Sequence, residues 1–226
     1  MARTGMEPVR RRALIGAAIE AIHAEGYCGV TVAEIARRAG VSYGLAHHYF
    51  GSKEQLLAAA MRHLFRLLGE EVVTRLRQAE TAEARLSALV RGNFARSQLQ
   101  PSLISAWLAF YMQVPASPAA AHLWRIYQRR LGSNLRSVLL QLGLEREAAQ
   151  DLAQLIAVLI DGQWLHYALS GEHPGAEAAA STVERSIWML IENRTGQARA
   201  VPDQEWQPAA DQGRPRGHRV VGRGGG

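Results

Sequence analysis

The stretch that decides the fold is TVAEIARRAGVSYGLAHHYFGSKEQ, residues 31–55. Thr31 and Glu34 have the T-x-x-E spacing of a capping box, which predicts a helix that begins directly after Thr31. Gly40 suits the left-handed backbone that ends a helix, and Ser42 can cap a second helix two residues later. Two short helices joined by a glycine turn are typical of a helix-turn-helix, a motif that inserts its second helix into the major groove of DNA.

Helical signals continue on both sides of this motif. Pro8 suits the first turn of a helix, and Gly26 is expected to end that helix. Ser52 and Gln55 repeat the capping-box spacing, so a long helix is expected to begin directly after Ser52 and to continue to about residue 80. Residues 1–52 are therefore expected to form a small helix-turn-helix DNA-binding domain.

The following segments also have the periodicity of helices. Each has one apolar face, and no segment alternates as a half-buried strand would. They cover residues 82–98, 101–114, 119–142, 145–170 and 176–193. The sequence thus predicts an all-α fold, in which residues 53–195 form a second, larger helical domain. Residues 196–226 are dominated by Gly, Pro, Arg and Gln, and are predicted to form a disordered basic tail.

Charge and cysteine content narrow the function. The net charge of +6 divides into +3 for residues 1–63, zero for residues 64–193 and +3 for residues 194–226. Positive charge therefore accompanies the expected DNA-binding end, as contact with phosphates requires. No apolar run approaches the roughly twenty residues of a membrane span. Cys28 is the single cysteine and the N-terminus has no recognisable secretory signal, so a reducing, cytoplasmic location is expected.

Enzymatic signals are missing from the sequence. It has no Gly-rich phosphate loop, no metal-ligand spacing and no nucleophile motif. His47 and His48 are adjacent, so they point to different helix faces and make a poor metal pair. We expect no catalytic residues, no metal and no cofactor. Two other classes are open alternatives: an enzyme with a DNA-binding domain, such as a recombinase or a helical hydrolase, and an architectural DNA binder without sequence preference.

The second helix of the motif carries the candidate DNA contacts. Tyr43 and Leu45 can contact thymine methyl groups, and Gly44 lets the backbone approach the DNA closely. The complete set of candidates is Thr31, Ser42, Tyr43, Gly44, Leu45, His47, His48, Tyr49 and Lys53. Nearby arginines either contact phosphates or lie on a solvated face, namely Arg10, Arg11, Arg12, Arg37 and Arg38. Phe50 is expected in the core.

Aromatic residues gather in the larger domain, namely Phe94, Trp107, Phe110, Tyr111, Trp124, Tyr127, Trp164, Tyr167 and Trp188. Asp161 lies three residues before Trp164 in the apolar run LAQLIAVLIDGQWL, where a carboxylate without a partner is costly. A quaternary ammonium would compensate it, because each aromatic face stabilises such a cation by roughly 0.5–2 kcal/mol. In the alternative interpretation the aromatic residues fill a helical core and Asp161 pairs with an arginine such as Arg130.

Residues 31–55 resemble the TetR family of bacterial transcriptional repressors. The matching residues are Thr31, Ile35, Ala36, Ala39, Gly40, Val41, Ser42, Gly44, His48, Tyr49, Phe50 and Lys53. The resemblance covers about residues 1–193. It implies that residues 53–195 bind an effector and that the last two helices form a homodimer, which reads a palindromic operator. His47 stands where the family usually has tyrosine.

Further segments resemble the choline-responsive members of this family, which repress genes of glycine betaine synthesis. They are MEPVRRRALI, IARRAGVS, GNF (92–94), AWLAF (106–110), RRLGSNL (129–135), LIDGQWL (159–165) and ALSG (168–171). The resemblance implies relief of repression by choline. The expected ligand residues are Trp107, Phe110, Tyr111 and Trp164, with Asp161 as the counter-charge, although Tyr111 stands where these members have tryptophan. Another cationic or lipophilic effector, such as an efflux substrate, is the alternative.

Overall fold

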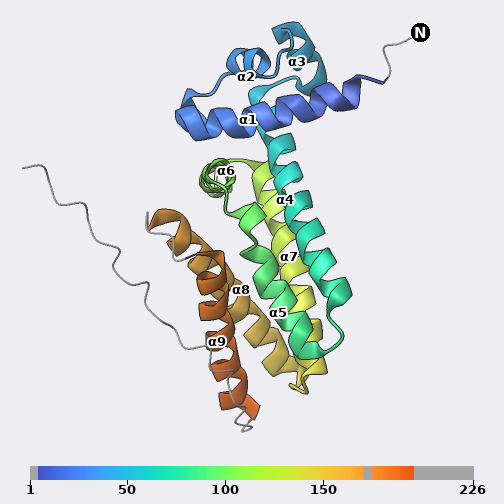
Figure 1. The fold of residues 1–226 in the computed structure, drawn as a ribbon, viewed down its shortest axis with the longest axis vertical. Coiled ribbons are helices and arrows are strands. Elements are labelled where there is room, and N and C mark those ends of the chain that lie inside the picture. The colour runs from blue at the N-terminus through green and yellow to red at the C-terminus, as the bar shows by residue number, and fades with distance from the viewer. Residues whose placement is uncertain (1–4, 171–174, 196–226) are drawn as a thin grey trace, which may run out of the picture.

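A computed structural model describes residues 5–170 and 175–195, and this part of the chain contains nine α-helices, one short 3-10 helix and no strand (Figure 1). The α-helices are α1 (Glu7–Gly29), α2 (Val32–Arg38), α3 (Tyr43–Phe50), α4 (Lys53–Gln78), α5 (Ala82–Asn93), α6 (Pro101–Gln113), α7 (Pro118–Gln141), α8 (Arg146–Leu169) and α9 (Ala176–Thr195). The predicted all-α fold is confirmed. The expected tail, 196–226, lies outside the described residues. None of the described helices is long and apolar enough to cross a membrane.

The predicted caps form the helix-turn-helix. Thr31 Oγ1 accepts a hydrogen bond from the Glu34 amide at 3.2 Å, and Ser42 Oγ accepts one from the Leu45 amide at 3.2 Å. Gly40 makes the turn between α2 and α3 with a φ of 66°. These local hydrogen bonds satisfy amide groups that a helix start otherwise leaves free, which explains why the two helices begin where the sequence predicts.

Two boundaries differ from the expectation. The first helix breaks at Gly26, where φ is 69° and ψ is 165°, but a further turn follows as far as Gly29. The segment expected as one helix over 82–98 ends at Asn93 and continues as a 3-10 helix, Arg96–Gln98. The chain turns there because Phe94 is buried in the core, at 2% exposure.

The remaining helices form a bundle below the first three (Figure 1). Helix α4 begins at the Ser52 cap, directly after α3, and descends along α5 and α7. Helix α6 lies beneath α1 and packs against it, while α8 packs against both α7 and α9. Two elements of the bundle, α4 and α6, therefore contact the helix-turn-helix end directly.

Gly92 allows α5 to approach α4 closely. A Cβ atom at this position would lie 2.6 Å from Val72 Cγ2 and 3.2 Å from Val72 Cα. Because Val72 is β-branched and sits inside α4, neither atom moves easily. We expect Gly92→Ala to lower the free energy of unfolding by about 1–3 kcal/mol in urea denaturation. Gly132→Ala is the matched control, since a Cβ there meets nothing within 4 Å.

Adding Val72→Ala to Gly92→Ala removes the contacting methyl group, so the double variant should recover most of the loss from the overpacked contact. An equal loss with and without Val72 would show that close packing is not the cause.

Candidate functional site

Helix α3 buries one face and exposes the rest. Ala46 and Phe50 are buried, which confirms Phe50 as a core residue. Tyr43 is 57% exposed at the start of the helix, and its ring lies 6.1 Å from that of His47. Gly44 is also exposed, and a Cβ added there would meet nothing within 4 Å. The protein's own packing therefore does not require glycine at position 44.

The other candidates for DNA contact lie around this face. Ser42, His47 and His48 are exposed, and Leu45 and Tyr49 are half-buried. Two candidates at neighbouring helix starts have structural roles. Thr31 caps α2, and Lys53 Nζ donates to the Tyr27 carbonyl at 2.9 Å and lies over the Tyr27 ring. The structure thus exposes most of the α3 candidates, while Lys53 joins the start of α4 to the end of α1.

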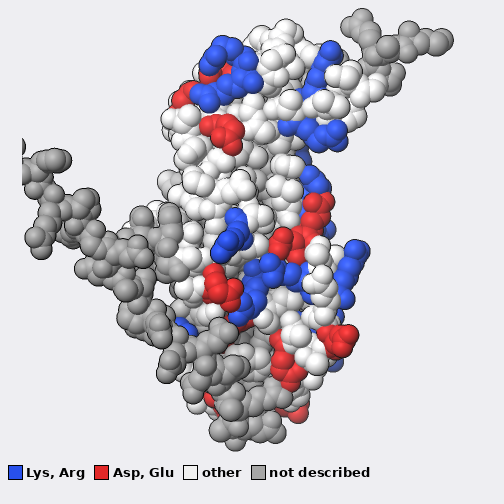
Figure 2. Space-filling model, in the orientation of Figure 1, with Lys and Arg blue, Asp and Glu red and all other residues white. Residues whose placement is uncertain are grey.

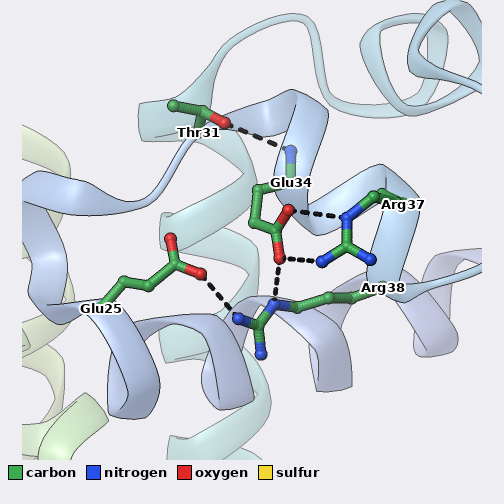
Figure 3. Close-up of polar contacts among 5 residues, drawn as sticks. All are labelled: Glu25, Thr31, Glu34, Arg37 and Arg38. Carbon is green, nitrogen blue, oxygen red and sulfur yellow. Dashed lines mark hydrogen bonds and ion pairs between the residues drawn. The ribbon is translucent and has the colours of Figure 1, made fainter.

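Glu34 organises the arginines of α2 (Figure 3). Its Oε1 accepts from Arg37 Nη2 at 2.7 Å and from Arg38 Nε at 2.6 Å, and its Oε2 accepts from Arg37 Nε at 2.8 Å. Arg38 Nη2 also donates to Glu25 of α1 at 2.6 Å. The Glu34 carboxylate thus serves the arginines rather than the amide of Thr31 that a complete capping box would use. This network connects α2 to α1 and partly neutralises two of the five arginines.

The same network gives a pH-dependent prediction. Hydrogen bonds from Arg37 and Arg38 lower the pKa of Glu34 from 4.5 to about 2. A lowered pKa means that the stabilising contribution is complete above pH 4.5 and is lost as the pH falls through the folded-state value. In thermal unfolding, Glu34→Gln should therefore reduce the melting temperature at pH 7, by an amount that shrinks between pH 4.5 and 2. Glu20→Gln, at an exposed site of α1, should show no such trend.

Arg11 holds the second helix of the motif in position. Its Nη1 donates to the Tyr49 carbonyl at 3.1 Å, its Nε donates to Glu7, and its guanidinium lies 5.0 Å from the centre of the Tyr49 ring. Arg10 and Arg12 form no ion pair within the described residues. Figure 2 shows Lys and Arg side chains over the end that contains α1–α3 and along α4. This end has the surface charge that phosphate contact requires.

An aromatic cluster fills the upper part of the bundle, between α4, α6, α7 and α8. The Trp107 ring lies 6.4 Å from Trp164, and Tyr111 lies 5.8 Å from Trp164. Together with Asp161 they line a small cavity, which we call the cage; its other lining residues are Leu68, Asn93, Gln98, Tyr127 and Ile160. Four of the five predicted ligand residues thus share one cavity. Phe110 does not line it, and packs behind Trp107 at 2% exposure.

Asp161 is the only charged residue among those lining the cage. Its Oδ1 accepts from the Tyr127 hydroxyl at 3.2 Å, and its Oδ2 accepts from Gln128 Nε2 at 2.8 Å. Burial raises the pKa of Asp161 above its ordinary value, and the two hydrogen bonds oppose that shift. The alternative pairing with Arg130 is wrong, because Arg130 is exposed and lines a different pocket. Within the described residues the Asp161 carboxylate has no cationic partner.

Several residues in or next to this site were not predicted from the sequence. Phe65 of α4 packs edge-on against Trp107, with ring centres 4.8 Å apart, and also contacts Tyr127 at 5.5 Å. It is the one Phe, Trp or Tyr residue of α4, and this feature of the sequence could have marked it as a candidate for the aromatic cluster. Gln98 lies in the 3-10 helix and is 3% exposed, and Gln128 bonds Asp161 from α7. Nothing in the local pattern distinguishes these two amides from surface residues.

The cage is small in this conformation. Its volume is about 20 Å³, which is room for about one water molecule. A quaternary ammonium is several times larger, so it can enter only if the surrounding side chains move apart. Those side chains belong to α4, α5, the 3-10 helix, α6, α7 and α8.

Two contacts connect the cage with the helix-turn-helix. Helix α4 carries Phe65 at the cage and begins directly after α3. Helix α6 carries Trp107 and Tyr111, and its Ser105 Oγ is hydrogen-bonded to His23 Nδ1 of α1 at 2.9 Å. The residues around the cage are therefore joined to the first three helices through both α4 and α6.

Helix α8 also exposes an apolar stripe. Leu155, Val158, Leu165 and Leu169 are exposed along it, and Met189 of α9 is exposed too. Other apolar residues of the two helices expected to form the homodimer, namely Leu152, Ile187 and Ile191, are buried within the chain and are not available to a partner. An exposed apolar stripe of this kind is typical of a surface that another protein covers.

These features define a class of protein, the helix-turn-helix DNA-binding regulators. The second helix of the motif is exposed beside a positive surface, and a separate helical bundle has its own cavity. Comparison with known proteins identifies the family. Residues 14–60 match the bacterial regulatory proteins of the tetR family, and residues 82–192 match the C-terminal domain of BetI-type transcriptional repressors. The chain therefore belongs to the TetR family, with a BetI-type C-terminal domain. It is a DNA-binding transcriptional repressor and not an enzyme.

Individual relatives support this assignment. The chain is 46% identical over 187 residues to the HTH-type transcriptional regulator BetI of Brucella anthropi, an alignment that covers 83% of this chain and 96% of the relative. It is 44% identical over 184 residues to BetI of Rhizobium meliloti, which covers 81% and 90%.

Solved structures have the same fold. A transcriptional regulator from Pseudomonas aeruginosa has a TM-score of 0.69 and 29% identity, with 84% of this chain and 95% of that chain covered. A regulator from Saccharomonospora viridis, solved in complex with choline, has a TM-score of 0.68 and 24% identity, with 80% and 96% covered.

Proposed function

We propose that this repressor controls genes that convert choline to glycine betaine and that choline relieves repression by binding in the cage. The observation that carries the proposal is Asp161, a buried carboxylate among aromatic rings with no cationic partner in the described part of the chain. Choline is a cation without N–H donors, so it is stabilised by aromatic faces and a nearby carboxylate rather than by hydrogen-bond acceptors alone. Trp107, Tyr111 and Trp164 supply the faces. A regulator of the same fold was solved in complex with choline, which supports the same choice of ligand.

At the other end, residues 1–52 act as the DNA-binding domain. Helix α3 enters the major groove with the exposed Tyr43, Gly44 and His47 toward base edges, while Arg10 and Arg12 contact phosphates. One such helix reads too few base pairs to be specific. The stripe on α8, together with α9, joins two chains into a homodimer, which reads both halves of a palindromic operator.

The coupling between the two ends follows from the size of the cage. Choline has no room in the closed conformation, so it binds the expanded one selectively and shifts the population toward it. Expansion displaces Phe65 with α4 and Trp107 with α6, and both helices contact the DNA-binding domain. The separation of the two recognition helices changes, and the dimer no longer matches its operator.

A second candidate effector class has one observation in its favour. A groove of about 620 Å³ lies between α4, α5 and α7 and shares Leu68, Asn93 and Tyr127 with the cage. Its walls are largely apolar, with Arg77 and Arg130 among the lining residues. A lipophilic effector fits this groove better than choline does, so the ligand screen must include one.

The test is fluorescence polarisation of labelled DNA from upstream of the chain's own gene, at one stated salt concentration, because phosphate contacts make affinity steeply salt-dependent. Specific binding that choline weakens and glycine betaine does not supports the proposal. Specific binding that only a lipophilic compound weakens assigns the effector to the second class. Binding that no small molecule changes contradicts both.

Gly44 offers a test of the DNA-binding surface alone. Because nothing lies within 4 Å of an added Cβ, Gly44→Ala should leave the fold intact and raise stability by about 0.5–1 kcal/mol through helix propensity. The added methyl group would hold the backbone away from DNA, so operator affinity should fall about tenfold or more while choline binding is unchanged. Gly69→Ala, a second open position on α4, is the matched control. Equal operator affinity for Gly44→Ala and wild type would show that the α3 backbone at Gly44 does not approach the DNA closely.

A further inference from the structure

Gln98 stands out because its side-chain oxygen has no partner. The residue is 3% exposed, and Oε1 is one of only two buried side-chain polar atoms, among the described residues, that lack a hydrogen bond. The other, Arg85 Nε, is not part of the cage. A buried acceptor left unsatisfied destabilises the fold, so such an atom in a native structure needs an explanation.

The position of Gln98 supplies one. It lines the same cavity as Asp161, Trp107, Tyr111 and Trp164, and reaches the cavity from the 3-10 helix between α5 and α6. The neighbouring amide, Asn93, is already engaged, since its Nδ2 donates to the Leu89 carbonyl and its Oδ1 shares the single proton of the Tyr127 hydroxyl with Asp161. Gln98 therefore brings an unused acceptor to a cavity that otherwise presents aromatic faces and one carboxylate.

We propose that Gln98 makes the cage specific for an effector that carries a hydroxyl group, by accepting a hydrogen bond from that hydroxyl while Asp161 and the rings hold the ammonium end. This inference rests on the proposed function. An alcohol has the donor that Oε1 needs, whereas an aldehyde or carboxylate at the same carbon has only acceptors. A carboxylate also meets the negative charge of Asp161. Gln98 thus separates a quaternary ammonium alcohol from its oxidised forms.

The experiment compares two ligands, with and without the hydroxyl group, in wild type and in variants of Gln98. The affinities of choline and of propyltrimethylammonium, in which a methyl group replaces the hydroxyl, are measured by isothermal titration calorimetry on the full chain. Wild type and Gln98→Met are compared, because methionine has a similar size but no strong acceptor. Gln98→Leu is the second variant, for use if Gln98→Met unfolds. Gln128→Met is the matched control, since Gln128 also borders the site but bonds Asp161 instead.

We expect wild type to bind choline at least tenfold more tightly than propyltrimethylammonium, and Gln98→Met to bring the ratio of the two affinities close to one. In Gln128→Met both affinities should fall together, which leaves the ratio as in wild type. If the ratio in Gln98→Met equals that of wild type, the cage is retained and the role of Gln98 is overturned. If wild type binds neither ligand, the proposal that the cage binds choline is contradicted, and so is the role of Gln98 that rests on it.

Discussion

Asp161→Asn is expected to abolish the response to choline and to raise the stability of the unliganded protein. Removal of one partner of a desolvated charge pair typically costs about 2–5 kcal/mol of binding free energy, or roughly 30-fold and more in affinity. The variant keeps the shape of the side chain and one acceptor for Tyr127 or Gln128. Repression should therefore persist, and choline should no longer lift it.

The expected gain in stability follows from the pKa of the carboxyl group. Burial raises the pKa of Asp161 in the folded chain, so the folded state favours the protonated form more than the unfolded state does. The stabilising effect of that proton is complete below the unfolded-state pKa and is lost as the pH rises through the raised one. At pH 7 the ionised side chain therefore destabilises the fold. A neutral asparagine avoids this cost, so the variant should unfold at a higher temperature than wild type when no ligand is present.

The same reasoning predicts how choline binding depends on pH. Only the ionised carboxylate attracts the cation, so choline affinity should decrease as the pH falls toward the raised pKa of Asp161 and should level off above it. Thermal unfolding without ligand and titration calorimetry across this range measure both effects. Asp151→Asn is the control, because Asp151 is exposed on the same helix. If Asp161→Asn binds choline like wild type, Asp161 does not face the ammonium group.

The sequence predicted the helices well because their signals are local. The caps at Thr31, Ser42 and Ser52 each act within three residues, and each appears in the structure as a hydrogen bond to the expected amide. The break in the predicted helix over 82–98 was missed because its cause is the burial of Phe94 in the core. That burial depends on residues distant in sequence, which periodicity does not reveal.

The candidate site was predictable to the extent that it lies on single helices. Trp107 with Tyr111, and Asp161 with Trp164, have helical spacing, and their convergence needed only that α6 and α8 meet. Phe65, which packs against the cage residue Trp107, and Gln98, which lines the cage, come from other elements, so their positions depend on the tertiary fold. The lack of a cation near Asp161 likewise depends on where Arg130 of α7 points, which no local pattern determines.

Val158→Glu is expected to convert the protein to a monomer and to weaken operator binding by roughly two orders of magnitude or more. Val158 is 66% exposed and is one of the residues of the α8 stripe, so a glutamate there leaves the folded chain undisturbed. In a two-fold interface the same substitution occurs on both sides, and each buried carboxylate lacks a partner. Loss of the dimer removes the second half-site contact, which typically contributes 10²–10⁴ to affinity.

The outcome is decided by molar mass from light scattering, together with operator polarisation. Met112→Glu is the matched control, because Met112 is 76% exposed on α6 and does not belong to the α8 stripe, and the variant should remain dimeric with unchanged operator affinity. If Val158→Glu remains a dimer, the dimer interface does not include the α8 stripe. A monomer that still binds choline would show that each cage is complete within one chain, as its lining by α4–α8 of a single chain requires. The dimer would then serve to set the distance between two DNA-binding helices, and the effector would act by changing that distance.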